Sequence, residues 1–396
     1  MQTNRFQHFK ANNMKLGQYY TPDSFSTLLI NNMNSKEAEI VLDIGCGQAN
    51  LLSAARKRWE KAKLIGFDID PKNYCVRRED LHIEFGNGFD PDLSQKIIDN
   101  FGYIDISVAN PPYTYVEVNQ NISKILKKSQ LSQCIPSSLK KIPSEIVFLA
   151  QNLIVLKESG ELGAILPASI ISGEKWKYLR EYLITEKGLN RVIQLPNKVF
   201  HRTEASTFVV NLCRSTREKC NDIELMSYEC DEKLSVDVVN GIRRLDYSYH
   251  SHLHKLPYYT DKIYVDTMIM YRGRKSSKEL YLTGSAFLHT KDLKENFQLL
   301  EYEENLYENG QRVAEKGDLV ISRVGSRCVG KSALITKGRI EVSDCIIVIK
   351  NVSSKKVTEH FISGKFYQAM MNCVLGTGAK YLTFNIIKEA LEAYEF

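Results

Sequence analysis

Apolar and polar residues follow one another along the first half of the chain in two alternating patterns. Short, nearly continuous apolar runs have the length of buried strands, and between them apolar residues recur at the spacing of a helix with one buried face. Strands separated by helices predict an α/β fold with an open, mostly parallel sheet and helices on both faces. The predicted strands are 39–43, 63–68, 82–85, 104–109, 162–166, 191–195 and 206–212, and the predicted helices are 48–59, 144–156 and 174–184.

The pattern changes in the second half of the chain. After residue 220 the helical spacing weakens and aromatic residues mix with charged ones, and from residue 281 short strand-like runs alternate with glycine turns before a closing helix at 385–395. The chain has 396 residues, more than one ordinary domain requires. We therefore predict two domains, residues 1–240 and 241–396, the second of the α+β class.

Composition narrows the class of protein only slightly. The formal net charge of +6 is compatible with a polyanionic partner, but many basic proteins bind none. The nine cysteines include no Cys-x-x-Cys pair, which favours reduced thiols in a cytoplasmic protein over a disulfide framework or a zinc site. No apolar run approaches the roughly 18 residues of a membrane helix, and the polar N-terminus does not resemble an export signal. We expect a cytoplasmic protein with no membrane association.

Alternate histidines occur at His250, His252 and His254. On a strand these side chains would share a face and could ligate a metal ion. No acid or cysteine has a matching spacing, so we expect a polar linker here and no metal site.

A glycine-rich loop follows the first predicted strand. Gly45 and Gly47 let the backbone turn tightly and approach a ligand, and the second strand ends at Asp68, which can accept hydrogen bonds from both hydroxyls of a ribose. Dinucleotide enzymes and methyltransferases share this combination. Asn50 stands where a dinucleotide fingerprint requires its third glycine, and Asp43 suits the amino group of a methionine moiety better than a pyrophosphate, so a methyltransferase is favoured.

The tetrapeptide Asn110-Pro111-Pro112-Tyr113 directly follows the fourth predicted strand. The two prolines fix the backbone and remove two N–H donors, so the loop presents oxygen acceptors. The side-chain oxygen of Asn110 and the carbonyl of Pro111 can both accept from a planar –NH2 group and direct its lone pair towards a methyl donor, without a strong base. Tyr113 can stack on a flat substrate ring.

A third motif, residues 17–22, precedes a predicted helix. Thr21 is expected to cap this helix, with Pro22 in its first position. We also expect Tyr20 and Thr21 to lie against the amino acid end of the cofactor.

Together these motifs resemble those of the gamma-class amino (N6-adenine) DNA methyltransferases, in which the cofactor motifs come first, Asn-Pro-Pro-Tyr next and a target-recognition domain last. The resemblance covers about residues 15–215 and implies a Rossmann-like methyltransferase fold with S-adenosyl-L-methionine as cofactor. The cofactor-binding residues that it implies are Tyr20, Thr21, Asp43, Gly45, Gly47, Asp68, Ile69, Asn87 and Asn110, and the catalytic residues are Asn110, Pro111, Pro112 and Tyr113.

Three positions are expected to contact the ring of the cofactor adenine or of a target base. The resemblance implies that Ile69 packs on the cofactor adenine and that Phe200 helps to hold a flipped-out base. Asn87 stands where the family usually has an acid that bonds the adenine amino group. Its amide oxygen can accept from that group without a charge, and Asp90 is the alternative.

Residues 317–350 resemble the target-recognition domains of type I restriction specificity subunits. The candidate DNA contacts there are Arg323, Arg327 and Lys331, because cationic side chains bind phosphates and guanine edges. Residues 114–143, rich in Ser, Lys and Gln, predict a mobile loop that closes near the DNA.

The resemblance implies that the chain methylates adenine N6 in duplex DNA, with the base flipped out of the stack. The chain would be the modification component of a restriction–modification system, and a companion restriction endonuclease is a candidate partner. The alternatives are methylation of another planar amine, an RNA base or a protein glutamine, and a specificity factor with a degenerate methyltransferase core. A bifunctional restriction–modification enzyme is disfavoured, because the chain has little room for a nuclease.

Overall fold

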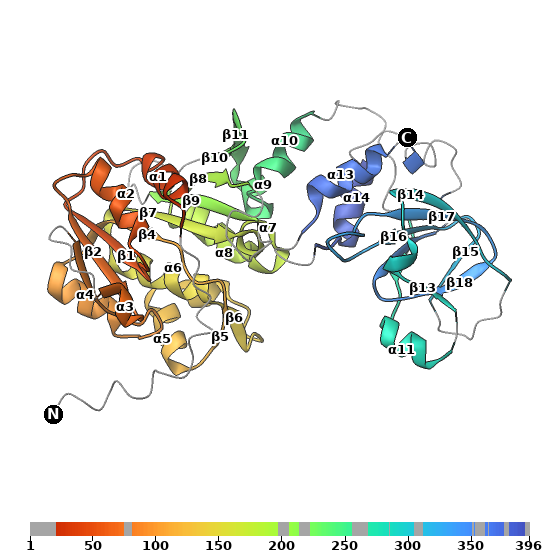
Figure 1. Ribbon diagram of the computed structural model, residues 1–396, viewed down its shortest axis with the longest axis horizontal. Coiled ribbons are helices and arrows are strands. Elements are labelled where there is room, and N and C mark those ends of the chain that lie inside the picture. The colour runs from red at the N-terminus through yellow and green to blue at the C-terminus, as the bar shows by residue number, and fades with distance from the viewer. Residues whose placement is uncertain are drawn as a thin grey trace. The chain divides into compact units, whose positions relative to one another are not determined.

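The computed structural model describes residues 21–74, 81–196, 206–213, 222–255, 268–284, 286–304, 312–350, 352, 361–362, 364–375 and 380–392. The chain divides into two compact units, Met1–Tyr247 and Ser248–Phe396 (Figure 1). Within the described residues, no helix has both the length and the apolar character needed to cross a membrane.

The described part of the first unit is built on one large sheet. Its strands are β1 (Ile40–Ile44), β2 (Lys63–Asp68), β3 (Leu81–Phe85), β4 (Ile104–Ala109), β7 (Leu156–Pro167), β8 (Leu189–Gln194), β9 (Thr207–Cys213), β10 (Asp222–Ser227) and β11 (Cys230–Asp237). They lie in the order β11-β10-β8-β9-β7-β4-β1-β2-β3. Neighbours are parallel except that β9 is antiparallel to β7 and β8, and β11 to β10. The prediction of an α/β fold with a mostly parallel sheet is confirmed.

Helices cover both faces of this sheet (Figure 1). They are α1 (Asp23–Asn31), α2 (Asn50–Arg58), α3 (Pro71–Tyr74), α4 (Leu93–Phe101), α5 (Gln120–Lys128), α6 (Ser144–Val155), α7 (Ala168–Ser172), α8 (Lys177–Thr185) and α9 (Val238–Arg243). Successive side chains of a strand point to opposite faces. Accordingly, Val41 of β1 packs with residues of α1 and α2, whereas Leu42 and Ile44 pack with residues of α4 and α6.

The order of the strands reverses beside β1. The chain passes from β1 outward through β2 to β3 and returns to β4 on the other side of β1. The loops that follow β1 and β4 therefore leave in opposite directions and open a crevice at the carboxyl ends of these strands. Asp43 of β1 pairs with Val108 of β4, so Asn110 begins its loop at this crevice.

Residues 114–143 form ordered structure, and the prediction of a mobile loop is wrong. Strands β5 (Tyr115–Glu117) and β6 (Lys141–Pro143) pair in antiparallel fashion around α5 and the short turn η1 (Leu131–Cys134). Ile122, Ile125 and Leu126 of α5 are buried in the cluster that also contains residues of α6. The polar composition hid these residues, which recur at helical spacing on one face of a short helix.

The described part of the second unit has three layers. Its strands are β12 (Met270–Arg272), β13 (Phe287–Leu288), β14 (Phe297–Glu301), β15 (Val313–Glu315), β16 (Leu319–Ser322), β17 (Ser332–Lys337), β18 (Arg339–Val342) and β19 (Ile346–Ile349), and its helices are α10 (Tyr247–Lys255, beginning in the first unit), α11 (Ser277–Leu282), α13 (Lys365–Cys373) and α14 (Phe384–Glu392). One sheet has the order β12-β19-β16-β17-β14 and the other β13-β18-β15. Leu319 and Ile321 pack on α13 and α14, while Val320 faces the smaller sheet.

Three expectations for the second half of the chain have clear outcomes. The closing helix is confirmed as α14. The segment that contains His250 and His252 is the helix α10 and not a linker, so the argument from alternate strand positions does not apply to it. Residues 277–282, where strand-like runs were expected to begin, form α11, whose start is closed by a capping box of Ser276 and Glu279.

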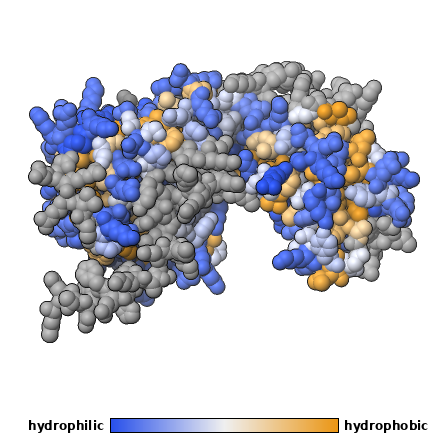
Figure 2. All heavy atoms as spheres, in the orientation of Figure 1, coloured by the Kyte–Doolittle hydropathy of each residue, from blue (hydrophilic) through white to orange (hydrophobic). Residues whose placement is uncertain are grey.

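Polar residues cover most of the described surface on the face drawn in Figure 2. This agrees with the burial of the apolar positions in the clusters between sheet and helices.

The packing of α5 generates a first prediction. Ile125 is fully buried, so Ile125→Ala leaves a cavity and should lower the free energy of unfolding by about 2–5 kcal/mol. Lys124→Ala, at the exposed neighbouring position, should stay within about 0.5 kcal/mol of the parent protein. Denaturant unfolding measures both, and equal stability of the two variants would mean that α5 is not packed as described.

Candidate functional site

A pocket lies at the carboxyl ends of β1 and β4, where the strand order reverses. It is open to solvent, and its empty space, with the solvent at its mouth included, is about 300 Å³. Its lining comes from the segment before α1, the glycine loop, the start of α2 and the end of β4: Thr21, Asp43, Gly45, Cys46, Gly47, Gln48, Asn50, Leu51 and Asn110. The structure therefore brings together the three sequence motifs that were predicted separately.

The glycine loop turns back towards β2. Gly45 and Gly47 have φ angles of 83° and 52°, which favour glycine over other residues. The N–H of Gly47 donates to the Asp68 carboxylate over 2.7 Å, and the N–H of Asp70 donates to its other oxygen over 2.8 Å. Asp68 thus fixes the loop against the end of β2. Its oxygens retain further lone pairs for a ligand.

The Asp43 carboxylate is buried without a full set of partners. The side chain is 2% exposed, and its Oδ1 atom has no hydrogen-bond partner in the structure. Burial, and secondly the charge of Asp68, raise the pKa of Asp43 well above its usual value. A buried charge without a partner is costly, so this oxygen is suited to a cationic ligand group in the pocket.

Cys46 lies inside the loop but is not built as a nucleophile. Burial raises the pKa of its thiol, which the carboxylates of Asp43 and Asp68 raise further. The thiol therefore stays protonated. A Cβ atom at Gly66 would lie 2.8 Å from the Cys46 sulfur, so the thiol packs closely on β2.

The Asn110 side chain is held at both ends. Its Nδ2 donates to the Thr21 hydroxyl oxygen over 2.9 Å, and the Tyr113 hydroxyl donates to its Oδ1 over 3.1 Å. Because Thr21 accepts from the amide nitrogen, the amide oxygen is directed to the side of Tyr113. This oxygen is the acceptor that the sequence pattern predicted for an amine.

The other end of the Asn-Pro-Pro-Tyr loop is anchored to α6. The Ser144 hydroxyl donates to the Pro112 carbonyl over 2.5 Å and accepts from the Thr114 N–H over 3.3 Å. Next to it, burial raises the pKa of Glu145 to about 7. Sequence reasoning missed Ser144, since the Pro143-Ser144 pair signals only the start of a helix.

Thr21 does not cap α1. The helix begins at Asp23, and Pro22 precedes it in an extended conformation with ψ at 148°. The prediction that Thr21 is the N-cap and Pro22 the first helical residue is therefore wrong. The Thr21 hydroxyl is engaged with Asn110 instead, and its carbonyl accepts from Asn50 Nδ2 over 2.7 Å.

The remaining predicted cofactor residues lie outside the pocket lining. Ile69 follows β2 and is half-buried. Asn87 Oδ1 accepts from the Phe89 N–H over 3.0 Å, and Asp90 is exposed with one oxygen accepting from the Asp92 N–H. Both side chains support the turn before α4 in this structure. Two further predicted site residues, Tyr20 and Phe200, lie outside the described residues.

The three candidate DNA contacts lie in one connection, between β16 and β17 of the second unit. Arg327 is exposed. Arg323 Nε donates to the Asp344 carbonyl over 3.2 Å, and Lys331 Nζ donates to the Lys294 carbonyl over 2.6 Å. Within the described residues no group of three His, Cys, Asp or Glu side chains could hold a metal ion.

An α/β sheet that carries a glycine loop after β1, an acid at the end of β2 and Asn-Pro-Pro-Tyr after β4 defines a Rossmann-like methyltransferase domain. The chain belongs to the N-6 DNA methylase family, whose sequence model matches residues 5–237.

Individual relatives are distant. The type I restriction enzyme EcoEI methylase subunit of Escherichia coli is 24% identical over 204 residues, 47% of this chain and 40% of its own. A protein of Methanocaldococcus jannaschii named as a candidate N5-glutamine methyltransferase is 29% identical over 111 residues, 28% of this chain and 54% of its own. The crystal structure of the type IIG restriction endonuclease BpuSI aligns with 94% of this chain and 58% of its own, at 13% identity and a TM-score of 0.48. The chain spans about two fifths of the length of the type I methylase subunits that it matches.

The buried Asp43 carboxylate, whose Oδ1 has no hydrogen-bond partner, generates a second prediction. Its pKa is higher in the folded than in the unfolded protein, so ionisation above the unfolded pKa of about 3.9 favours unfolding. Asp43→Asn should therefore raise the thermal midpoint of the ligand-free protein at pH 7, and the gain should disappear as the pH falls below that value.

Asp105→Asn is the matched control. The Asp105 carboxylate accepts from the Ile40 N–H over 2.9 Å and from Lys157 Nζ over 2.5 Å. Neutralising this paired acid should lower the midpoint. Calorimetry across pH 3 to 8 measures both variants, and a lower midpoint for Asp43→Asn at pH 7 would contradict the account of Asp43.

Proposed function

We propose that the chain is a site-specific DNA methyltransferase that transfers a methyl group from S-adenosyl-L-methionine to the N6 atom of an adenine flipped out of duplex DNA. The observation that carries this proposal is the arrangement of Asn110. Thr21 and Tyr113 hold its amide oxygen on one side of a pocket that also contains Asp43, whose Oδ1 has no hydrogen-bond partner. Membership of the N-6 DNA methylase family supports the same reaction.

The proposed cofactor is assigned to the pocket and to predicted residues near it in the sequence. S-adenosyl-L-methionine supplies a methyl group bound to a positively charged sulfur. Asp43 would accept from the amino group of its methionine moiety, because Oδ1 is buried and lacks a partner. Asp68 would accept from the ribose hydroxyls, Gly45 and Gly47 would permit close approach, and Ile69 would pack on the adenine. Asn87 or Asp90 would accept from the adenine amino group, and Tyr20 and Thr21 would flank the amino acid end.

The Asn-Pro-Pro-Tyr loop would hold the target amine. Asn110 Oδ1 and the Pro111 carbonyl each accept one of its N–H groups, which directs the nitrogen lone pair towards the methyl donor. The Tyr113 hydroxyl does not prevent this, because a carbonyl oxygen has two lone pairs and can accept twice. As the nitrogen gains a methyl group it loses a proton to these acceptors or to water. The protein contributes position and electrostatics and no strong base.

Duplex DNA is the proposed partner, and the target adenine must leave the stack to reach this loop. Phe200 would help to hold the flipped base, and Tyr113 would stack on it. The second unit would act as the target-recognition domain of a gamma-class enzyme, with Arg323, Arg327 and Lys331 as its first candidate contacts. A role as the modification component of a restriction–modification system, with a companion endonuclease, is supported by the type I methylase subunits among the relatives.

The second candidate function is methylation of another planar amine. One relative is named as a candidate glutamine methyltransferase, and the same loop could hold a glutamine amide or an RNA base. The family match and the additional second unit favour DNA.

The substrate is tested with radiolabelled cofactor. Incubation with duplex DNA, RNA and protein extract in parallel should label DNA, and digestion should place the label on N6-methyladenine. Label confined to RNA or to glutamine would contradict the proposal.

The role of the loop generates a third prediction. Asn110→Ala removes the acceptor of the target amine and should lower transfer by about 10²–10³-fold or more, while S-adenosyl-L-methionine still binds. Asn240→Ala, at an exposed position of α9, should leave both unchanged. Single-turnover transfer and calorimetric binding give the two values, and near-normal turnover of Asn110→Ala would refute the role of the amide.

A further inference from the structure

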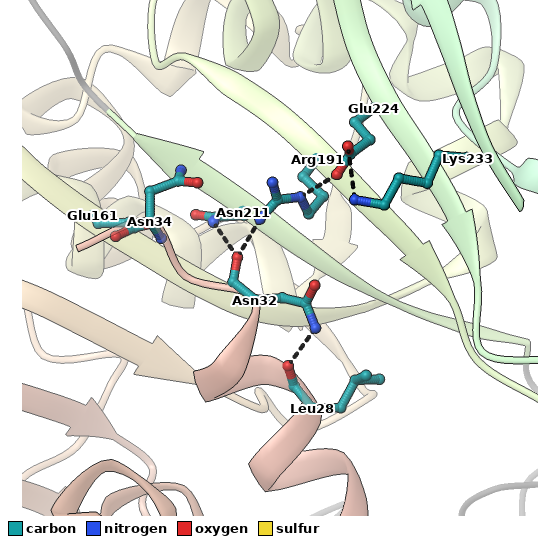
Figure 3. Close-up of polar contacts among 8 residues, drawn as sticks. All are labelled: Leu28, Asn32, Asn34, Glu161, Arg191, Asn211, Glu224 and Lys233. Carbon is teal, nitrogen blue, oxygen red and sulfur yellow. Dashed lines mark hydrogen bonds and ion pairs between the residues drawn. The ribbon is translucent and has the colours of Figure 1, made fainter. Parts of the chain in front are cut away.

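A group of polar side chains, of which Glu161 and Asn211 are buried, holds the carboxyl end of α1 on the sheet (Figure 3). Glu161 of β7 is fully buried, and its carboxylate accepts from the N–H of Asn34 over 2.6 Å, from the N–H of Ser35 over 2.8 Å and from the Ser35 hydroxyl over 2.6 Å. A carboxylate with three donors is well satisfied. The turn after α1 is therefore an anion site made mainly of backbone amides, and the Glu161 carboxylate occupies it.

The next two strands of the sheet after β7, which are β9 and β8, hold Asn32 at the end of α1. Arg191 of β8 and Asn211 of β9 both donate to the Asn32 carbonyl, over 2.6 and 3.0 Å (Figure 3). Glu224 of β10 accepts from Arg191 over 2.5 Å and from Lys233 over 3.3 Å. Side chains of β7, β9 and β8 thus all form hydrogen bonds with the turn at residues 32–35.

Apolar packing and a second arginine restrict the helix further. Leu29 of α1 packs directly on β7, where a Cβ atom at Gly163 would lie 2.7 Å from it. Arg58 of α2 donates to the carbonyls of Met33 and Ser35 over 2.8 and 2.9 Å. We call the set Glu161, Arg191, Asn211 and Arg58 the α1 clamp.

The clamp fixes the carboxyl end of α1, and the segment before the amino end of α1 reaches the pocket. Helix α1 has nine residues and is about 13 Å long. Pro22 precedes it, and a proline restricts the backbone at this junction. The residue before Pro22 is Thr21. Its hydroxyl accepts from Asn110 Nδ2, and its carbonyl accepts from Asn50 Nδ2.

We propose that Glu161 is a positioning residue for methyl transfer: by fixing α1 it places the Thr21 hydroxyl, and the Thr21 hydroxyl sets the orientation of the Asn110 amide. The inference rests on the proposed function of Asn110. A merely structural clamp would stabilise the fold without acting on Asn110. The difference is measurable, because only a positioning role makes the effect of Glu161 depend on Thr21.

Glu161→Gln is the informative variant. Glutamine has nearly the same size, but only one of its two terminal atoms is an acceptor, so an N–H group of the turn is left without its partner. Thr21→Val removes the hydroxyl at nearly constant volume, and Thr21→Ser restores it. Glu158→Gln, at an exposed position of the same strand β7, is the matched control.

The first measurement is a double-mutant cycle on single-turnover transfer to duplex DNA free of methylated adenine, at saturating cofactor. Glu161→Gln and Thr21→Val should each lower the rate about tenfold, and the double variant should be no slower than the slower single variant. Thr21→Ser should recover most of the rate, and Glu158→Gln should keep all of it. Multiplying effects of the two substitutions would overturn the proposal.

The second measurement needs no methyl acceptor. In protein labelled with ¹⁵N-asparagine, the Asn110 side-chain amide signal is assigned by its loss in Asn110→Ala. Glu161→Gln and Thr21→Val should shift this signal in the same direction, and Glu158→Gln should not shift it. An unchanged signal in Glu161→Gln would overturn the positioning role. A shifted signal in a protein that methylates no DNA would instead refute the proposed function and leave the positioning intact.

A milder variant covers the case in which Glu161→Gln does not fold. Ser35→Ala removes only the hydroxyl that donates to Glu161. It should shift the Asn110 signal in the same direction by a smaller amount, and its failure to do so would again overturn the proposal.

Discussion

The parallel pairing of β1 with β4 is the constraint on which the site depends. The register that sets Asp43 beside Val108 brings an acid from the first strand and the Asn110 loop from the fourth to one edge of the sheet. Strand order reverses at this point, so no further strand fills the space between the two loops. The same pairing places apolar neighbours on both faces, and their burial offsets the cost of keeping a carboxylate without a full set of partners at the edge.

The Asn-Pro-Pro-Tyr loop is held from three directions before any substrate arrives. Thr21 approaches from the segment before α1, Tyr113 from the loop itself and Ser144 from the start of α6. A loop fixed in this way loses little freedom when an amine binds. In the proposed reaction, which uses no strong base, the placement of acceptors would supply most of the rate.

Local patterns predicted the parts of this structure that depend on local physics. Apolar periodicity gave the strands β1 to β4 and β7 to β9 and the helices α2, α6 and α8, but not α4, β10 or β11. Backbone chemistry marked the glycine loop and the proline-rich loop. The same reasoning failed for α5, where a nine-residue helix with a polar composition has too few apolar positions to be seen. It failed for Thr21 because the alternative partner, Asn110, lies 89 residues away. It had no means to find the α1 clamp, in which Glu161 meets residues 126 and 127 positions earlier.

Buried acids separate into two kinds in this fold, and the distinction assigns their roles. Glu161 accepts from two N–H groups and one O–H group, and these hydrogen bonds help to fix a backbone turn. Asp43 is equally buried, yet one of its oxygens has no donor and its pKa is raised by burial. A buried acid with a raised pKa at the edge of a pocket is typical of a ligand-binding site. We therefore assign Glu161, which the protein satisfies, to the proposed support of the site, and Asp43, which lines the pocket, to the proposed site itself.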